Sequence, residues 1–409
     1  MRACLSMARL AVAAACLWAG AGSLHARPAD PPRTASDLVA LADRALAQGK
    51  VGPALVMYGD VVSQVPRYAP ARAGLRRALA RLGSPRRAEG VLRYFLAENP
   101  TREAALLAAW QTLDRVAPFR VSATAALLPS TNVDRVASER YLVTGYGTFR
   151  IRDGGQQKSG MGAAFGVNLD WYIHPRPGHR FRLSAMLSGA WFSRAHLRFA
   201  EPGVSVGYEH LRGRAPWSAQ IYLRRRAYDG TEGDVTGDRL TLGAGFVKTW
   251  RVKRGDRVTL RLSSEYQRFS EQPYFSGPRH HIGLDRSQPV GKTGRLSYGI
   301  SLDRARPAKD YHRYTGIAIS AGYERRLMKG LRGGIWIALG EQRYDAPFPL
   351  VGVRRHDRIA SIGISAQLTR VRIWGQKPRL YCGVRRNRSN VALYTTRSID
   401  CSMSLTVDF

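Results

Sequence analysis

The chain changes its pattern of hydrophobic and polar positions near Pro118. Before this proline, apolar residues such as Leu38, Leu41 and Ala45 recur at the spacing of one helix face, which is the 3.6-residue period of an amphipathic helix. After it, apolar and polar residues alternate, which is the period of an extended strand with one apolar face. The pattern predicts a multi-domain α+β protein whose helices come first.

The predicted helical domain covers residues 27–117. Ser36 and Asp37 open its first helix, and further helical segments follow at about 52–64, 70–82, 85–97 and 101–115. Four pairs of residues recur after 34 positions: Leu41 and Leu75, Gly49 and Gly83, Ala54 and Ala88, and Pro66 and Pro100. This is the tetratricopeptide period, so we predict two degenerate repeats and a capping helix that dock a peptide or a partner protein. An unrelated small helical bundle is the alternative.

Fourteen segments with strand alternation occupy residues 118–409. They lie at about 119–128, 160–172, 181–192, 202–210, 217–226, 238–248, 257–268, 279–288, 294–304, 313–325, 331–343, 358–369, 378–387 and 397–409. Their lengths suit the ~9–11 residues that a tilted strand needs to cross a membrane. The links between them are alternately long and short, as in outer-membrane barrels with short periplasmic turns. We predict a transmembrane antiparallel β-barrel of about 14 strands in the outer membrane, with the helical domain in the periplasm. A soluble β-sandwich would also alternate, but it rarely has this many strands in one sheet.

The start of the chain has the pattern of a secretory signal peptide over residues 1–26. Arg2 and Arg9 precede an apolar run, and cleavage is expected after Ala26, or after Ala21 as the alternative. The run is shorter than the ~20 residues that a membrane-spanning helix needs. The sequence therefore predicts export.

The last strand ends the chain on an aromatic residue. Leu405, Val407 and Phe409 share one face of this strand, because polar residues separate them. Such an ending resembles the C-terminal signal that the barrel-assembly machinery recognises, so this machinery is a predicted partner. The last strand of a soluble sheet is the alternative interpretation.

The charge is strongly basic, with a formal net charge of +34. A polyanionic partner is therefore expected, and export favours the lipopolysaccharide of the outer membrane over nucleic acid. Period-two counting places Arg224, Arg226 and Arg261 in the lumen, where rings of arginine favour anionic passengers. The alternative is that such arginines lie at the rims against lipopolysaccharide phosphates, or pair with luminal carboxylates.

Only two cysteines, Cys382 and Cys401, remain after removal of the signal peptide. The last hairpin places them nearly opposite each other, so a disulfide is geometrically allowed, with two free lipid-facing thiols as the alternative. The sequence has no CxxC motif, no cysteine and histidine cluster, and no catalytic triad or carboxylate pair in strand register. We therefore predict no metal, no cofactor and no enzymatic activity.

Three stretches resemble motifs of the surface lipoprotein assembly modulators, the Slam family of outer-membrane translocation proteins. They are Ala125-Ala126-Leu127-Leu128-Pro129-Ser130-Thr131-Asn132-Val133-Asp134-Arg135, Gly375-Gln376-Lys377-Pro378, and Arg386-Asn387-Arg388-Ser389-Asn390-Val391 together with Tyr394. The resemblance implies a non-enzymatic barrel that moves a particular cargo, either a lipoprotein or a soluble secreted protein, from the periplasm to the cell surface. Asn132, Ser389 and Asn390 are the motif residues at strand-to-loop junctions, and turn formation is their alternative role.

Two functions from different classes remain open at this stage. The first is an outer-membrane translocation protein with a secreted cargo protein as its partner. The second is a polysaccharide or solute export porin with a tetratricopeptide scaffold.

Overall fold

The computed structural model describes residues 34–152, 158–193, 195–229, 237–253, 255–373 and 376–408. The predicted signal peptide over residues 1–26 lies outside the described residues, and so do Gly375 and Phe409.

Over its described residues, 34–117, the helical domain consists of five α-helices, which confirms the predicted segments. They are α1 (Ala35–Ala47), α2 (Val51–Gln64), α3 (Ala69–Ala80), α4 (Pro85–Glu98) and α5 (Glu103–Val116), with a short 3-10 helix, η1 (Pro100–Arg102), before α5. The first helix begins slightly earlier than predicted because Thr34 caps it. The Thr34 hydroxyl accepts a hydrogen bond from the Asp37 backbone N–H at 3.2 Å, and the Asp37 carboxylate accepts one from the Thr34 N–H at 3.1 Å, which is a capping box. Among the described helices, none has the length and apolar character to cross a membrane.

Helix α2 is the centre of this domain and packs against α1, α3 and α5. Gly59 permits the closest approach, since a Cβ at this position would lie 2.4 Å from the carbonyl oxygen of Ala105 on α5. Two residues of the 34-residue repeat occupy similar places: Gly49 and Gly83 follow shortly after the ends of α1 and α3. They have positive φ angles of 74° and 85°, which glycine adopts without strain. The helix pairs are thus observed, while their assignment to the tetratricopeptide class stays a prediction.

In the described residues from 119 onward, the chain forms a closed antiparallel barrel of fourteen strands, which confirms the predicted fold class. The strands are β1 (Phe119–Ser130), β4 (Gly160–Arg176), β5 (His179–Phe192), β6 (Phe199–His210), β7 (Trp217–Tyr228), β8 (Arg239–Lys253), β9 (Asp256–Phe269), β10 (Gly277–Val290), β11 (Gly294–Ala305), β12 (Tyr314–Met328), β13 (Leu331–Pro347), β14 (Arg354–Leu368), β15 (Arg379–Ser389) and β16 (Thr396–Asp408). Each strand pairs with its sequence neighbours in the barrel, and β1 pairs with β16 to close it.

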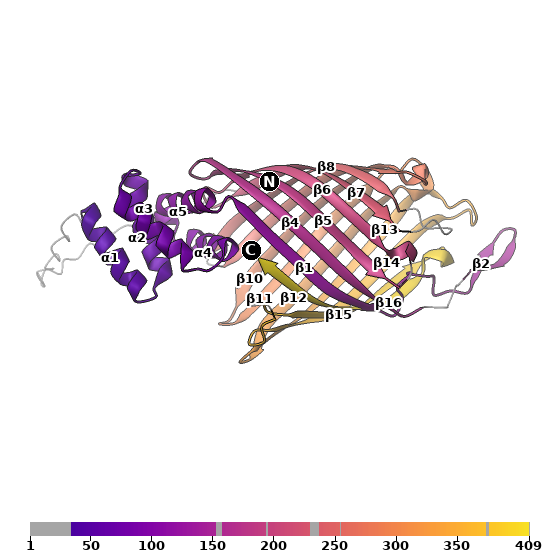
Figure 1. Cartoon of the computed structure of the whole chain (residues 1–409). Helices are drawn as coiled ribbons and strands as arrows, with labels where there is room; N and C mark the ends of the chain where they lie inside the picture. The colour runs from indigo at the N-terminus through magenta and orange to yellow at the C-terminus, as the bar shows by residue number, and fades with distance from the viewer. Residues whose placement is uncertain are drawn as a thin grey trace, which may run out of the picture.

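Strands β2 (Tyr141–Thr144) and β3 (Gly147–Arg150) form a separate hairpin in the connection from β1 to β4. The sequence did not predict them, because four-residue strands are too short to establish a clear alternation. Figure 1 shows this hairpin beyond the barrel, at the end opposite the helices. We call these two ends of the barrel the loop end and the helical end.

The outer wall of the barrel carries an apolar belt. Outward-facing Ile221 and Ile364, for example, are 64% and 61% exposed, which suits lipid rather than water as the surrounding medium. At the helical end, neighbouring aromatic rings continue from strand to strand on this wall, with Tyr208 lying 5.3 Å from Phe181 and 5.3 Å from Trp217 between ring centroids. Such aromatic rows mark the boundary of the lipid layer in outer-membrane barrels.

Candidate functional site

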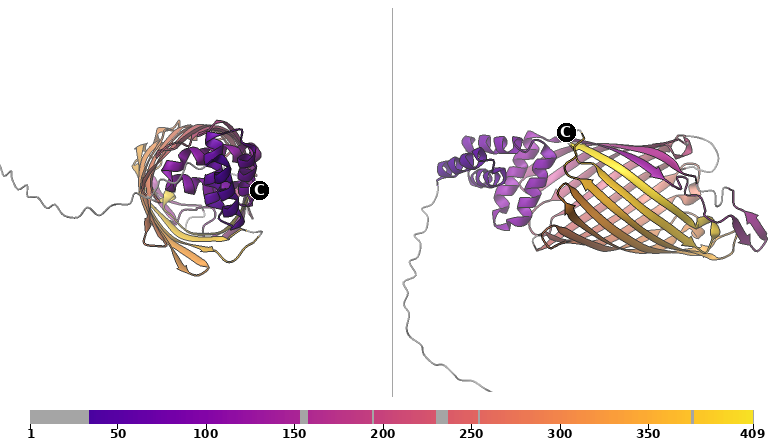
Figure 2. Two further views of the ribbon diagram at one scale, coloured as in Figure 1. Left: turned by 90° about the vertical axis from the view of Figure 1, so that its left-hand side faces the viewer. Right: turned by 90° about the horizontal axis from the view of Figure 1, so that it is seen from below.

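The helical domain is attached to the barrel at the inner wall of its first strands. Leu211, in the turn after β6, is buried in the hydrophobic core of the helical domain. The Glu103 carboxylate at the start of α5 accepts a hydrogen bond from the Gly213 N–H at 3.1 Å, and Gln111 on α5 donates one to the carbonyl oxygen of His174 at 3.2 Å. Figures 1 and 2 show the helices lying across one side of the barrel opening.

Two fully buried arginines lie at the centre of this attachment. The side chains of Arg120 on β1 and Arg180 on β5 are 0% exposed. Arg180 donates to Glu209 on β6 at 2.5 Å and to Glu89 on α4 at 3.1 Å, while Arg120 pairs with Glu89 and with Asp114 on α5. We call these five residues the junction cluster. It joins carboxylates of two helices to arginines of two strands.

The junction cluster compensates for the burial of its charges. Burial by itself would raise the pKa of Glu89, but Coulomb attraction to Arg180, Arg93 and Arg120 outweighs it and lowers the pKa to about 2. The guanidinium carbons of Arg120 and Arg180 also lie over the Tyr172 ring, at 4.2 Å and 4.0 Å from its centroid, an arrangement that favours a desolvated cation. Because removing one member of a buried ionic group leaves the others uncompensated, the cluster holds the two domains in one arrangement.

Further polar contacts surround the junction cluster. His174 Nδ1 lies 2.8 Å from an Asp114 carboxylate oxygen, and Arg86 on α4 hydrogen bonds to Ser122 of β1 at 2.9 Å. Sequence reasoning missed the junction cluster, because its five members are spread over three strands and two helices and no local motif connects them. The sequence feature that could have indicated this site is the presence of charged residues at inward-facing positions near the start of the barrel.

The three arginines predicted to be luminal all face carboxylates within the barrel. Arg224 lies 3.1 Å from Glu265, and Arg226 lies 2.5 Å from Glu201. Arg261 pairs with an aspartate, Asp285. The interior charge near these arginines is therefore compensated by neighbouring strands.

The motif residue Asn132 fixes the exit from β1. It is 1% exposed, and its side-chain amide donates to the carbonyl oxygens of Val136 at 3.0 Å and Arg397 at 2.9 Å. Its amide oxygen accepts from the Val136 N–H at 2.9 Å. These bonds join the first connection to the last strand.

The motif residues Ser389 and Asn390 likewise fix the backbone at the loop ends of β14 and β15 by hydrogen bonds. Asn390 accepts a hydrogen bond from the His356 N–H at 2.8 Å and donates to the Arg354 carbonyl oxygen at 2.8 Å. The Ser389 hydroxyl accepts from the N–H of Val391 at 3.1 Å, and Val391 is buried against loop-end residues of other connections. The matched motif residues thus shape the loop end.

The C-terminal residues lie on the closing strand. Leu405 and Val407 on β16 pair with Ala125 and Ala123 on β1. Cys382 and Cys401 lie opposite each other on β15 and β16 and form a disulfide with an S–S distance of 2.12 Å.

Residues 119–409 match the protein family described as "Surface lipoprotein assembly modifier". The chain belongs to this family. The match covers the whole barrel, begins where β1 begins, and agrees with the resemblance inferred from the short motifs. The protein is accordingly an outer-membrane protein of this surface lipoprotein assembly modifier family, with an N-terminal helical domain. No curated protein matches the chain significantly.

Solved structures similar to the chain are outer-membrane proteins of low sequence identity. One is a loop-deletion mutant of OmpT from Vibrio cholerae, with 7% identity, a TM-score of 0.39, and coverage of 71% of this chain and 98% of that chain. Another is Salmonella typhi OmpF in complex with daunomycin, with 9% identity, a TM-score of 0.41, and coverage of 71% and 97%.

Proposed function

We propose that this protein delivers a specific lipoprotein, or a soluble secreted protein, from the periplasm to the cell surface. The observation that carries the proposal is the junction cluster, which fastens the helical domain to the inner wall at one end of the barrel. A protein-binding module held there presents a bound cargo directly to the barrel. Family membership supports the same process.

The proposal places the helical end in the periplasm and the loop end at the cell surface. Short connections at the helical end support this orientation, since only two residues separate β4 from β5 and β12 from β13. The longest connection, from β1 to β4 with the β2–β3 hairpin, lies at the other end, as expected for the outer face of such a barrel. The ten residues between β14 and β15 are an exception at the helical end. Tyr146, at the tip of that hairpin, is 90% exposed. A Tyr146→Cys variant should react with a membrane-impermeant maleimide on intact cells.

A cysteine in the helical domain is the matched control for orientation. Gln48, after α1, is exposed, so Gln48→Cys should react only after the outer membrane is permeabilised. The reverse pattern of labelling would contradict the proposed orientation.

The lumen gives less support to the alternative of an anion-selective export pore. Arg224, Arg226 and Arg261 each contact a carboxylate, so these arginines do not present uncompensated positive charge to a passenger. The export pore therefore becomes one outcome of the functional test.

Surface display of the cargo tests the proposal. The protein is expressed with the product of the adjacent gene, and the cargo is assayed for protease accessibility on intact cells. The variants are a deletion of residues 27–117 and Glu89→Ala, which releases the helical domain without altering a strand. The matched control is Arg77→Ala, because Arg77 forms an ion pair with Asp43 in the same domain that is exposed to solvent.

Display that requires both the barrel and a docked helical domain supports the proposal. Display that is equal in the deletion, in Glu89→Ala and in the wild type would remove the helical domain from delivery. Cargo hidden in every strain, together with steady ion conductance in planar bilayers, would favour the export pore.

A further inference from the structure

Four arginines form a cluster on the barrel wall near the loop end. They are Arg358 on β14, Arg386 and Arg388 on β15, and Arg397 on β16, and we call them the outer arginine cluster. All four are exposed. Within the part of the chain that the structure describes, none of their guanidinium groups has a hydrogen bond or ion pair.

The outer arginine cluster lies on the same face as the apolar belt. Arg358 is in phase with Ile362 and Ile364 along β14, and both isoleucines are exposed on the outer wall, because side chains two residues apart share a face. On β16, Arg397 precedes the outward-facing Ile399 by two residues in the same way. The cluster therefore continues the lipid-facing wall toward the loop end.

Within this cluster, like charges face each other across the strands. Arg358 pairs in register with Arg388, and Arg386 pairs with Arg397. Like charges in directly opposite positions destabilise a sheet. This arrangement is compatible with a stable wall when an anion from outside the chain lies between the guanidinium groups.

Neighbouring arginines on the same wall are paired within the chain. Arg304 lies 2.6 Å from Asp345, and Arg343 lies 2.5 Å from Glu341. Glu341 on β13 lies in register with Arg358, but its carboxylate contacts Arg343 and, at 2.9 Å, His356. Arg355 on β14 also pairs with a carboxylate, that of Asp357. Within the described residues, the lack of a carboxylate contact is thus a property of the four clustered arginines rather than of their strands.

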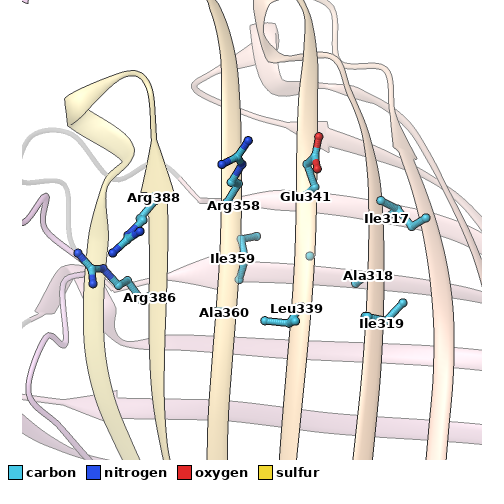
Figure 3. Close-up of a pocket in the computed structure, with 11 residues that line it drawn as sticks. Ile317, Ala318, Ile319, Leu339, Glu341, Arg358, Ile359, Ala360, Arg386 and Arg388 are labelled. Carbon is cyan, nitrogen blue, oxygen red and sulfur yellow. The ribbon is translucent and has the colours of Figure 1, made fainter.

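A groove of ≈610 Å³ joins the arginines to the apolar belt. Its lining includes Ile317, Ile319 and Leu339 as well as Arg358, Arg386 and Arg388. One carboxylate, that of Glu341, also lines the groove, and it is paired with Arg343. Figure 3 shows the guanidinium ends of Arg386 and Arg388 beside each other, with Arg358 on the next strand. Glu341 and Leu339 lie on the strand after that, and Ile317 and Ile319 on the strand beyond it. The groove therefore combines a cationic part with an apolar part on the membrane-facing wall.

We propose that the outer arginine cluster and this groove bind a phosphorylated glycolipid of the outer leaflet, the lipid A part of lipopolysaccharide. An acyl chain lies along the apolar lining, and the lipid phosphates lie between the opposed guanidinium groups. Arginine suits this task because its planar fork donates two parallel hydrogen bonds to a phosphate. The choice of leaflet rests on the orientation proposed above, whereas the site does not depend on the identity of the cargo.

Binding of defined lipids to the full-length protein in detergent tests the site. The probes are bisphosphorylated lipid A and the dephosphorylated lipid with the same acyl chains, and the readout is native mass spectrometry. The wild type should retain lipid A in preference to the dephosphorylated lipid. Arg386→Gln with Arg388→Gln should weaken lipid A binding by about tenfold or more, since a hydrogen bond to a charged group contributes that much or more.

Arg225→Gln with Arg268→Gln is the matched control. Both arginines are exposed near the loop end of β7 and β9, but each is opposite Leu240 of β8 rather than another arginine. This control should retain lipid A. An equal loss of lipid A binding in both double variants would show that the positive charge of the loop end as a whole attracts the lipid. This result would overturn the proposed site.

Three other outcomes also decide the proposal. Unchanged lipid A binding in Arg386→Gln with Arg388→Gln overturns it, and so does equal retention of the dephosphorylated lipid by the wild type. Competition by millimolar inorganic phosphate alone would identify a free-anion site instead of a lipid site.

A folding control keeps the test decisive. Heat-modifiable migration in gels reports whether each barrel is closed, and Arg386→Lys with Arg388→Lys substitutes for the glutamine variant if that variant does not fold. The lysine variant keeps the charge but loses the fork geometry, so it should also bind lipid A more weakly than the wild type, and wild-type binding would overturn the proposal. Cargo display and maleimide labelling of Tyr146→Cys, measured separately, distinguish failure of the lipid site from failure of the delivery function or of the orientation.

Discussion

The two ends of the barrel use arginine in opposite ways. At the helical end, Arg120 and Arg180 are fully buried, and carboxylates from helices and strands surround them. At the loop end, the outer arginine cluster is exposed, and its members face one another. The net charge of +34 therefore comprises sites that are compensated within the chain and sites that the chain leaves without a carboxylate contact.

Burial explains the difference. A charge removed from water is strongly destabilising without a partner, so the junction cluster must be complete before the helical domain can dock. An exposed guanidinium stays hydrated, so the outer arginine cluster can remain unpaired until the barrel reaches a membrane. The same residue type thus fixes two domains together at one end and favours an external ligand at the other.

The largest expected effect is that of Glu89→Ala. It should weaken docking of the helical domain by about 3–5 kcal/mol, because it leaves buried Arg120 and Arg180 short of a partner. The measurement is limited proteolysis in detergent, where the helical domain should be degraded while the barrel stays heat-modifiable. Equal protease protection in the variant and the wild type would show that the junction cluster does not hold the domains together.

Acid should weaken the junction as well. The pKa of Glu89 is lowered from 4.5 to about 2 in the folded protein, so its stabilising effect is complete above about pH 4.5 and is lost as the pH falls toward 2. At 1.36 kcal/mol per pKa unit, the loss is on the order of 3 kcal/mol. Digestion by pepsin, measured across this pH range, should increase as the pH falls, and Glu89→Gln should flatten that dependence. If the protection of the wild type against pepsin did not depend on pH, the stabilising role assigned to the ionised Glu89 would be contradicted.

Charge reversal in the outer arginine cluster should stabilise the barrel, and by less than Glu89→Ala weakens the docking of the helical domain. Arg386→Glu places a carboxylate opposite Arg397, and an opposite-charge pair across strands is worth about 0.2–1 kcal/mol. In lipid-free detergent, the barrel should therefore unfold at a slightly higher temperature, as followed by heat-modifiable migration. In the lipid assay the same variant should lose lipid A. A lower unfolding temperature in detergent would contradict the inference that the cluster is destabilised by its own charge.

The smallest effect is expected for Arg77→Ala. Arg77 lies 2.8 Å from Asp43, and their side chains are 58% and 47% exposed, so the pair should contribute only about 0–1 kcal/mol. Thermal unfolding of the helical domain should change little. A loss comparable to that of Glu89→Ala would mean that burial is not what separates the two kinds of ion pair.

The fold was largely predictable because lipid on one side of the wall imposes strict alternation. The segment predicted at 257–268, for example, is β9 at Asp256–Phe269. The segment predicted to end at residue 172 continues in β4 to Arg176, because Tyr172 and His174 face the helical domain and keep the alternation beyond the apolar belt.

The junction cluster was not predictable because its five residues come together only in the folded protein. Glu89 and Asp114 have no special spacing on their helices, and only the register of the barrel brings Arg120 and Arg180 to them. The disulfide was left open for a related reason. Its formation depends on the register of β15 against β16, which places Cys382 opposite Cys401.

The connectivity of the junction also has a consequence for the order of assembly. The contacts of Glu89 with Arg120 and Arg180 span 31 and 91 residues of sequence, whereas the contact of Thr124 with Thr406 across the closing strands spans 282. Short loops close at a lower entropic cost than long ones. We expect the helical domain to bind the first strands while the barrel is still an open sheet. The pairing of β1 with β16, which closes the barrel, would then follow after the helical domain has docked at the opening.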